Sequence, residues 1–177
     1  DRGSSMVRPP YVVTMLEGIR TAVPPDCEII HSNGKDIAKA VNMARKADTA
    51  IIITGYTHKD EGEYMFVKGG DRDTLTIKPH DEELILRVAA EVPRTIVVIV
   101  CGSAIITEAW REKVPAILVA WYPGMEGGNA LADILLGKVC PCAKLPCVFP
   151  KSGSQLPFFD KRARSIEYGY FHGYRLM

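Results

Sequence analysis

The sequence lacks the charge asymmetry and the long apolar stretches that mark several classes of protein. Its 22 Lys and Arg residues nearly balance 21 Asp and Glu residues over 177 positions, and no run of five or six like charges occurs. The longest apolar stretches, at residues 95–101 and 115–121, are far shorter than the roughly 20 residues needed to cross a bilayer. We therefore expect neither nucleic acid nor a membrane as a partner.

Motifs that bind nucleotides or activate a serine are also missing. Neither G-x-G-x-x-G nor G-x-x-x-x-G-K-[ST] occurs, and "GMEGGN" (residues 124–129) comes late and lacks either pattern. A serine hydrolase would need G-x-S-x-G at a strand-to-helix turn, whereas Gly102-Ser103 has no second glycine. We expect Ser103 to cap a following helix, and Gly127 and Gly128 to allow close packing against a sheet.

Cysteine is present in an odd number, five, which provides no obvious disulfide framework. Cys27 and Cys101 lie in apolar, strand-like runs, so we interpret them as small buried hydrophobic residues. The other three lie in "VCPCAKLPC" (residues 139–147), which lacks the paired C-x-x-C spacing and the nearby His of a typical zinc site. We predict no metal site and interpret these three residues as ordinary loop thiols.

The spacing of apolar residues predicts an alternation of strands and helices. Strands are expected at residues 27–32, 49–55, 94–102, 115–121 and, briefly, 145–149, and helices at 11–22, 37–47, 80–92, 104–112 and 124–137. The strand at 49–55 shows no polar alternation, so both of its faces should be covered, as in a parallel sheet. The predicted fold class is α/β, a mostly parallel sheet sandwiched between helices, in one domain spanning residues 1–177.

The connection that follows the strand at 49–55 is far longer than such a fold needs. It reads "YTHKDEGEYMFVKGGDRDTLTIKPH", about 25 residues where about 2 to 6 are usual. Glu61 and Glu63 lie two residues apart beside Asp60, and crowded carboxylates raise one another's pKa, which would suit a general acid. The alternative interpretation is a solvated acidic loop. Ligands bind beyond the carboxyl ends of parallel strands, so this loop and "YPGMEGGN" should both lie on the rim of a site.

Several segments together resemble the second domain of glycoside hydrolase family 3, the β-glucosidase and related exo-glycosidase family. The segments are "DRGSSMVRPPYVVTMLEGI", "DEGEYMFVKGGDRDTL", "VPAILVAWYPGMEGGNALADILLGKVCPCAKLPCVFPKS" and "YGYFHGYR". The resemblance covers nearly all 177 residues in the right order. It implies a longer enzyme, truncated here at both ends, in which an upstream (β/α)8-type barrel supplies an aspartate nucleophile and the loop at 56–80 supplies the general acid/base.

The resemblance also implies the substrate and the residues of the site. The enzyme would be a retaining β-glycosidase, β-glucosidase-like, that hydrolyses terminal β-linked sugars without a cofactor, its partners being a β-linked glucoside or oligosaccharide and the barrel. In the family the acid glutamate lies shortly before an aromatic residue and an Asp-Arg pair, so Glu63, directly before Tyr64, is the first choice for the acid/base. Glu61 is the second choice, which stays open because "MFVKG" lengthens the family's usual motif. The candidate substrate contacts are Tyr64, Asp71, Arg72 and Glu126, with a structural role at the loop base favoured for Asp71 and Arg72.

Other interpretations remain open at this point. Trp121 and Tyr122 are candidate rim residues, although packing against the core is the better interpretation for Trp121. A non-catalytic α/β module that binds carbohydrate or braces the barrel would explain the same pattern if the acid comes from elsewhere. In either case we expect the isolated chain to be inactive, because a glutamate acts as an acid only where partner walls exclude water and raise its pKa.

Overall fold

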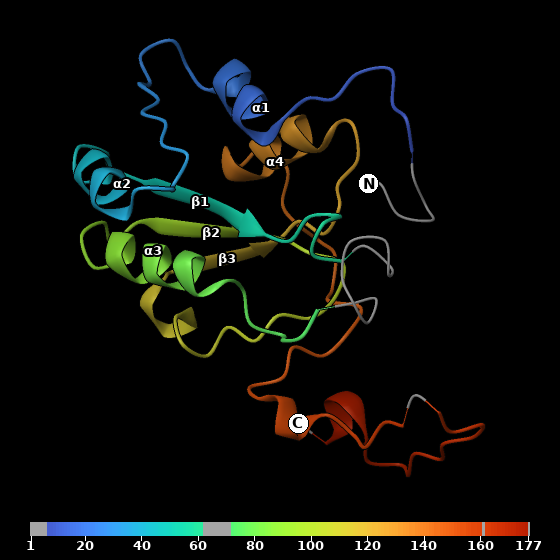
Figure 1. The fold of residues 1–177 in the computed structure, drawn as a ribbon. Helices are drawn as coiled ribbons and strands as arrows, with labels where there is room; N and C mark the ends of the chain where they lie inside the picture. Colours follow the sequence, from blue (N-terminus) through green and yellow to red (C-terminus); the bar gives the residue numbers. More distant parts are fainter. Residues whose placement is uncertain (1–6, 62–71, 161, 177) are drawn as a thin grey trace.

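The computed structural model describes residues 7–61, 72–160 and 162–176. Within these residues a parallel sheet is built from β1 (Ala50–Gly55), β2 (Thr95–Val100) and β3 (Ala116–Val119), in that order. Ile52 of β1 is in register with Val97 of β2, which is in register with Ile117 of β3. Because the strands run in the same direction, their carboxyl ends meet at one edge of the sheet (Figure 1).

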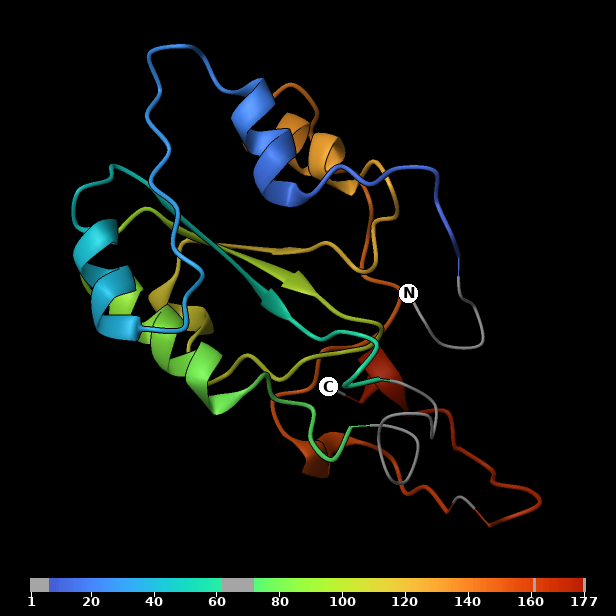
Figure 2. The same ribbon diagram turned by 45° about the horizontal axis from the view of Figure 1, so that its top comes forward.

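Helices lie on both sides of this sheet in two pairs. On one side α1 (Met15–Ala22) packs against α4 (Gly127–Leu135), and on the other α2 (Ile37–Ala44) packs against α3 (Pro79–Ala89), as Figures 1 and 2 show. The main core joins the sheet to the second pair and includes Val41, Ile52, Ile85, Val88, Val97, Ile99, Cys101 and Trp110. The predicted fold class, an α/β sandwich with a parallel sheet, is confirmed.

The ends of the helices follow from local side-chain chemistry. The hydroxyl of Thr14 accepts a hydrogen bond from the backbone N–H of Glu17, whose carboxylate in turn accepts from the N–H of Thr14, so a capping box starts α1. Asp36 caps α2 by accepting a hydrogen bond from the N–H of Lys39 at 2.9 Å. Pro79 opens α3, where its fixed φ suits the first turn.

The two helices of the first pair touch through glycine. A Cβ built on Gly18 would lie 2.1 Å from the carbonyl oxygen of Gly128, and a Cβ on Gly128 would lie 2.2 Å from the carbonyl oxygen of Thr14. Only glycine allows such a close approach of two backbones. The predicted close packing at Gly128 is therefore present, but its partner is α1 rather than the sheet.

Three predicted elements are wrong. Residues 27–32 and 145–149 form no strand, and residues 104–112 form no α-helix. In the last of these, the N–H of Ile106 donates to the carbonyl oxygen of Leu75 at 2.8 Å, which fixes the backbone as an isolated bridge between Thr76 and Ile106. A short apolar run becomes a strand only if an edge is available to pair with it, and that edge cannot be read from the run itself.

Of three burial predictions, for Cys101, for Cys27 and for the faces of β1, only the first is confirmed. Cys101 is fully buried, and burial raises the pKa of its thiol to about 11, as expected for a structural cysteine. Cys27 is exposed, because the segment that contains it joins no sheet. Ile53 is 40% exposed, so the faces of β1 are covered less completely than its apolar sequence predicts.

The chain beyond α4 differs from the rest. We call residues 137–176 the C-terminal arm, which within its described part contains no α-helix or strand but two 3₁₀ turns, at Gly153–Gln155 and Gly173–Arg175. Both views show the arm leaving the layered body of the domain (Figures 1 and 2). None of the helices described here is long and apolar enough to cross a membrane.

Candidate functional site

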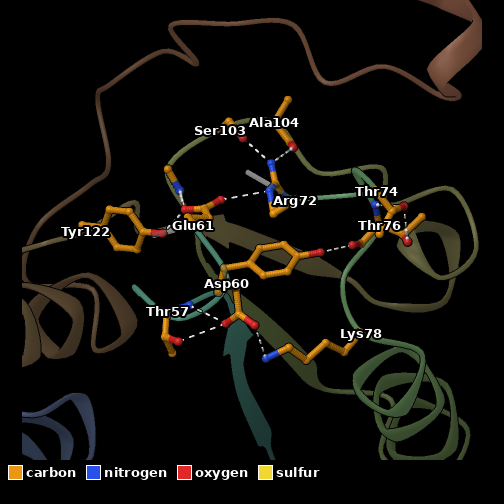
Figure 3. A network of polar contacts seen from close by, with 12 residues as sticks. Thr57, Asp60, Glu61, Arg72, Thr74, Thr76, Lys78, Ser103, Ala104 and Tyr122 are labelled. Atoms are coloured by element: carbon orange, nitrogen blue, oxygen red, sulfur yellow. Dashed lines mark hydrogen bonds and ion pairs between the residues drawn. The ribbon is translucent and has the colours of Figure 1, made fainter. Parts of the chain in front are cut away.

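Side chains that follow all three strands converge at the carboxyl edge of the sheet (Figure 3). Glu61 and Arg72 come from the long connection after β1, Ser103 follows β2, and Tyr122 follows β3. This convergence is a consequence of the parallel order β1-β2-β3, because each strand delivers its next loop to the same edge. Both loops predicted to lie on the rim are therefore there.

Glu61 occupies the centre of this group. Its Oε1 lies 3.0 Å from Nε of Arg72, and its Oε2 accepts hydrogen bonds from the backbone N–H of Gly102 at 3.1 Å and from the hydroxyl of Tyr122. The side chains of Glu61 and Arg72 are only 13% and 5% exposed, respectively. Both oxygens of the carboxylate are thus held by donors from this chain.

Arg72 extends the group toward the loop after β2. Its guanidinium donates to the hydroxyl of Ser103 and to the carbonyl oxygen of Ala104 at 3.3 Å, and its Cζ lies 4.4 Å from the centre of the Tyr56 ring. A planar guanidinium suits this combination of a forked hydrogen-bond pattern and an aromatic face. We call Tyr56, Glu61, Arg72, Gly102, Ser103, Ala104 and Tyr122 the rim network.

The two tyrosines of the rim network are held in their protonated form. Burial, followed by the hydrogen bond to Glu61, raises the pKa of Tyr122, and burial raises the pKa of Tyr56. Tyr122 therefore acts as a hydrogen-bond donor to Glu61, and Tyr56 donates to the carbonyl oxygen of Thr76. Trp121, next to Tyr122, has a φ of 54° and packs as predicted against the core, with its ring 6.3 Å from that of Phe149.

Asp60 is separate from the rim network although it is adjacent to Glu61. Its carboxylate accepts hydrogen bonds from the N–H and hydroxyl of Thr57, at 2.9 and 3.0 Å, and lies 2.9 Å from the ammonium of Lys78. Burial acts to raise the pKa of Asp60, but the hydrogen bonds from Lys78 and Thr57 outweigh it and lower that pKa. The prediction that crowded carboxylates raise one another's pKa is wrong for Asp60, because this group has its own cation.

Of the remaining predicted site residues, only Glu126 lies in the described part of the chain, and it does not join this group. Glu63, Tyr64 and Asp71 lie outside the described residues. Glu126 lies at the start of α4, where it accepts hydrogen bonds from the hydroxyl of Tyr11 at 2.5 Å and from the side chain of Asn129 at 2.6 Å. These two bonds lower the pKa of Glu126 and fix it against the N-terminal segment.

Four members of the rim network, Tyr56, Gly102, Ser103 and Ala104, were not predicted as site residues from the sequence. Gly102 contributes its backbone N–H to Glu61, and Ser103 accepts from Arg72 rather than capping a helix, because no α-helix follows it. The signal for Gly102 was its place directly after a buried strand, where a glycine permits close approach. A Cβ at this position would lie 2.9 Å from Oε2 of Glu61.

The network offers side chains that can hold a carboxylate in place but no evident metal centre. Among residues 7–61, 72–160 and 162–176, no group of three or more His, Cys, Asp or Glu is arranged to hold a metal ion. Glu61 directly precedes residues 62–71 and Arg72 directly follows them. The ion pair between Glu61 and Arg72 therefore holds both ends of this loop at the edge of the sheet.

Comparison with known proteins identifies the family of this chain. The sequence model of the glycosyl hydrolase family 3 C-terminal domain matches residues 1–176. A beta-xylosidase from Formosa agariphila is 32% identical over 157 residues, which are 84% of this chain and 21% of that protein.

Solved structures give the same result. The crystal structure of a beta-D-glucoside glucohydrolase from Trichoderma reesei superposes with a TM-score of 0.85 at 31% identity, covering 97% of this chain and 25% of that one. A family 3 beta-glucosidase from Bifidobacterium adolescentis gives a TM-score of 0.71 at 30% identity, covering 88% of this chain and 23% of that one. The chain thus spans about a quarter or less of these relatives, and it belongs to glycoside hydrolase family 3, in which it is the C-terminal domain.

Proposed function

We propose that this chain is the C-terminal domain of a retaining β-glycosidase, β-glucosidase-like, that hydrolyses terminal β-linked sugars. In this proposal the loop at 56–80 supplies the general acid/base, Glu63, to a catalytic aspartate on an upstream barrel domain of the same polypeptide. The names of the similar proteins, a beta-xylosidase and beta-glucosidases, support this reaction class.

The observation that carries the proposal is the ion pair between Glu61 and Arg72 at the sheet edge. It joins the two ends of the loop that contains Glu63, and donors after β2 and β3 hold it there. Glu63 is only two residues from Glu61 in the sequence, so the proposed acid/base belongs to a segment that is anchored at the rim. A carboxyl group carried at this rim is well placed to face a domain docked against the same edge.

The contacts of Glu61 favour Glu63 as the acid/base. A general acid must present a proton to the leaving oxygen, and a general base must then take a proton from water. One oxygen of Glu61 forms an ion pair with Arg72, and the other accepts hydrogen bonds from Gly102 and Tyr122, which argues against a direct role of Glu61 at the substrate. In this proposal Glu61 holds the loop in position and Glu63 performs the proton transfers.

The chemistry requires two carboxyl groups about 5 to 5.5 Å apart. The aspartate of the barrel attacks the anomeric carbon while Glu63 gives its proton to the departing glycosidic oxygen, which breaks the carbon–oxygen bond. Glu63, now a carboxylate, then removes a proton from water, whose oxygen attacks the same carbon and releases the aspartate. Proton transfers of this kind contribute about 10²- to 10⁴-fold to the rate.

The test is to replace Glu63 in the complete enzyme, encoded by the reading frame that contains these residues. Glu63→Gln should lower kcat/KM about 10²- to 10⁴-fold for alkyl glucosides, whose leaving groups need protonation, and much less for dinitrophenyl glucosides. Unchanged rates on alkyl glucosides would refute the role of Glu63 and favour an accessory module. A reading frame without a barrel domain would refute the enzyme proposal as a whole.

A matched pair of variants separates Glu63 from Glu61. With dinitrophenyl glucoside as substrate, azide should restore turnover of Glu63→Ala and give a β-glycosyl azide, because azide attacks the covalent intermediate without help from a base. Azide should not restore Glu61→Ala, whose defect is in the position of the loop. If azide instead restored only Glu61→Ala, Glu61 would be the acid/base and Glu63 the residue that positions the loop.

A further inference from the structure

The C-terminal arm carries an unusual concentration of exposed aromatic side chains. Five of them are each at least 68% exposed: Phe158, Phe159, Tyr170, Phe171 and Tyr174. In the body of the domain, the described residues include no aromatic side chain as exposed as these. Aromatic side chains bury about 150 to 250 Å² each when fully covered, and these five are 68 to 79% exposed, so together they still offer on the order of 500 to 900 Å² for a partner to cover. That is close to the roughly 800 Å² that one partner contributes to a stable protein interface.

The arm has little core of its own. It joins the body chiefly through residues 148–150, where Phe149 packs against Trp121 and Pro150 is buried. Between its two passes, residues 145–148 and 172–175, lies an open hollow of about 560 Å³. The aromatic side chains therefore cannot be explained as the interior of a small separate unit.

The exposed side chains nevertheless hold one another in fixed positions. Arg175 stacks on Tyr170, with its Cζ 4.5 Å from the ring centre, and the rings of Tyr170 and Phe171 meet edge to face at 5.2 Å. The hydroxyl of Tyr168 donates to the carbonyl oxygen of Phe158 at 3.1 Å and links the two aromatic groups. Tyr, Phe and Arg residues held in this way are typical of the energetic centre of a protein interface.

Charge adds a second, independent argument. Residues 137–177 contain seven Lys and Arg against two Asp and Glu, a net charge of +5, whereas the whole chain has +1, so residues 1–136 carry a net −4. Among the described residues, no carboxylate forms an ion pair with Arg162 or Arg164. A surface that complements the arm would be apolar with an acidic margin.

The comparisons indicate what this surface belongs to. The Trichoderma reesei structure covers 97% of this chain, which leaves about five residues unmatched, far fewer than the arm contains. The arm thus follows a similar path in a protein of which this chain corresponds to 25%. An extended segment without its own core keeps such a path when another part of the molecule supports it.

We propose that the C-terminal arm is a docking surface for the upstream domain of the same polypeptide, through Phe158, Phe159 and the cluster at 168–175. This rests on the part of the proposed function in which an upstream domain exists, and not on the role of Glu63. In this proposal the arm and the rim network contact the same upstream domain. The arm supplies the apolar surface that binds it, and the rim network holds the catalytic loop.

Hydrogen–deuterium exchange of the complete enzyme tests this proposal. Backbone amides of residues 156–160 and 168–176 should exchange at least tenfold more slowly in the complete enzyme than in the 177-residue chain, at every protein concentration. Phe158→Ser/Phe159→Ser should remove the protection, whereas Ile30→Ser, an exposed apolar residue of the body, should leave it unchanged.

Three outcomes would overturn the proposal. Equal exchange in both proteins would show that nothing covers the arm, and protection of the 177-residue chain that grows with its concentration would show that a second copy covers it. A reading frame without an upstream domain would remove the proposed partner. The result is separable from that of Glu63→Gln, because an inactive variant with a protected arm supports both proposals, and a fully active one with a protected arm refutes only the catalytic role.

Discussion

The rim network and the C-terminal arm both consist of chain outside the helices and strands, yet their side chains find partners in different places. In the rim network Arg72 is 5% exposed and contacts residues that follow β1 and β2. In the arm Phe158 is 79% exposed and Tyr174 is 76% exposed. The side chains of the rim network find their partners within this domain, whereas the aromatic side chains of the arm are exposed to solvent.

This difference separates two kinds of stability. The rim network should contribute to the folding of the domain itself, because breaking it leaves charges buried without partners. The arm should contribute to the cohesion of the complete enzyme, because its apolar surface is covered only when the neighbour is present. Substitutions in the rim network should therefore destabilise the isolated domain, whereas substitutions in the arm should destabilise only the complete enzyme, and the two losses should differ in size.

The largest effect should follow the loss of Arg72. Arg72→Met leaves the carboxylate of Glu61 beside apolar and aromatic groups without its cation, and removing one partner of a buried pair costs about 3 to 5 kcal/mol. Urea denaturation of the 177-residue chain, followed by the fluorescence of Trp110 and Trp121, would measure this loss.

A matched control uses an equally well-formed ion pair in solvent. Arg45 and Glu91 lie 2.7 Å apart, with side chains 52% and 38% exposed. Exposed pairs contribute about 0 to 1 kcal/mol, so Arg45→Met should be nearly neutral. Equal effects of the two substitutions would contradict the distinction between a buried network and a solvated pair.

The sequence predicts the body of the domain better than it predicts the rim. The strands β1, β2 and β3 and the helices α1 to α4 were predicted because each carries a long apolar pattern of its own. The contacts among Glu61, Gly102 and Tyr122 were not, since they depend on the strand order that brings together loops 41 and 61 positions apart. The missing strand at 27–32 has the same cause, because pairing is a property of two segments.

A smaller effect should follow a methyl group added at the centre of the rim network. In Gly102→Ala the new Cβ would lie 2.9 Å from Oε2 of Glu61 and 3.1 Å from Cε2 of Tyr122, and Glu61 is held in place by Arg72. Overpacking of this kind costs about 1 to 3 kcal/mol. The same denaturation experiment should show this loss and no comparable loss for Gly153→Ala, where a Cβ meets nothing within 4 Å. A neutral Gly102→Ala would mean that the network adapts freely and does not fix the loop.

The smallest effect in the isolated domain should come from the arm. Phe158→Ser should change the free energy of unfolding of the 177-residue chain by no more than about 0.5 kcal/mol, because a side chain 79% exposed loses little on truncation. In the complete enzyme the same substitution should lower the unfolding midpoint, because there the ring is covered by the upstream domain. Differential scanning calorimetry of both proteins, each with and without the substitution, measures the two effects side by side. A loss above about 1 kcal/mol in the isolated chain would mean that the arm folds back on its own domain in solution, and the contrast between rim and arm would then disappear.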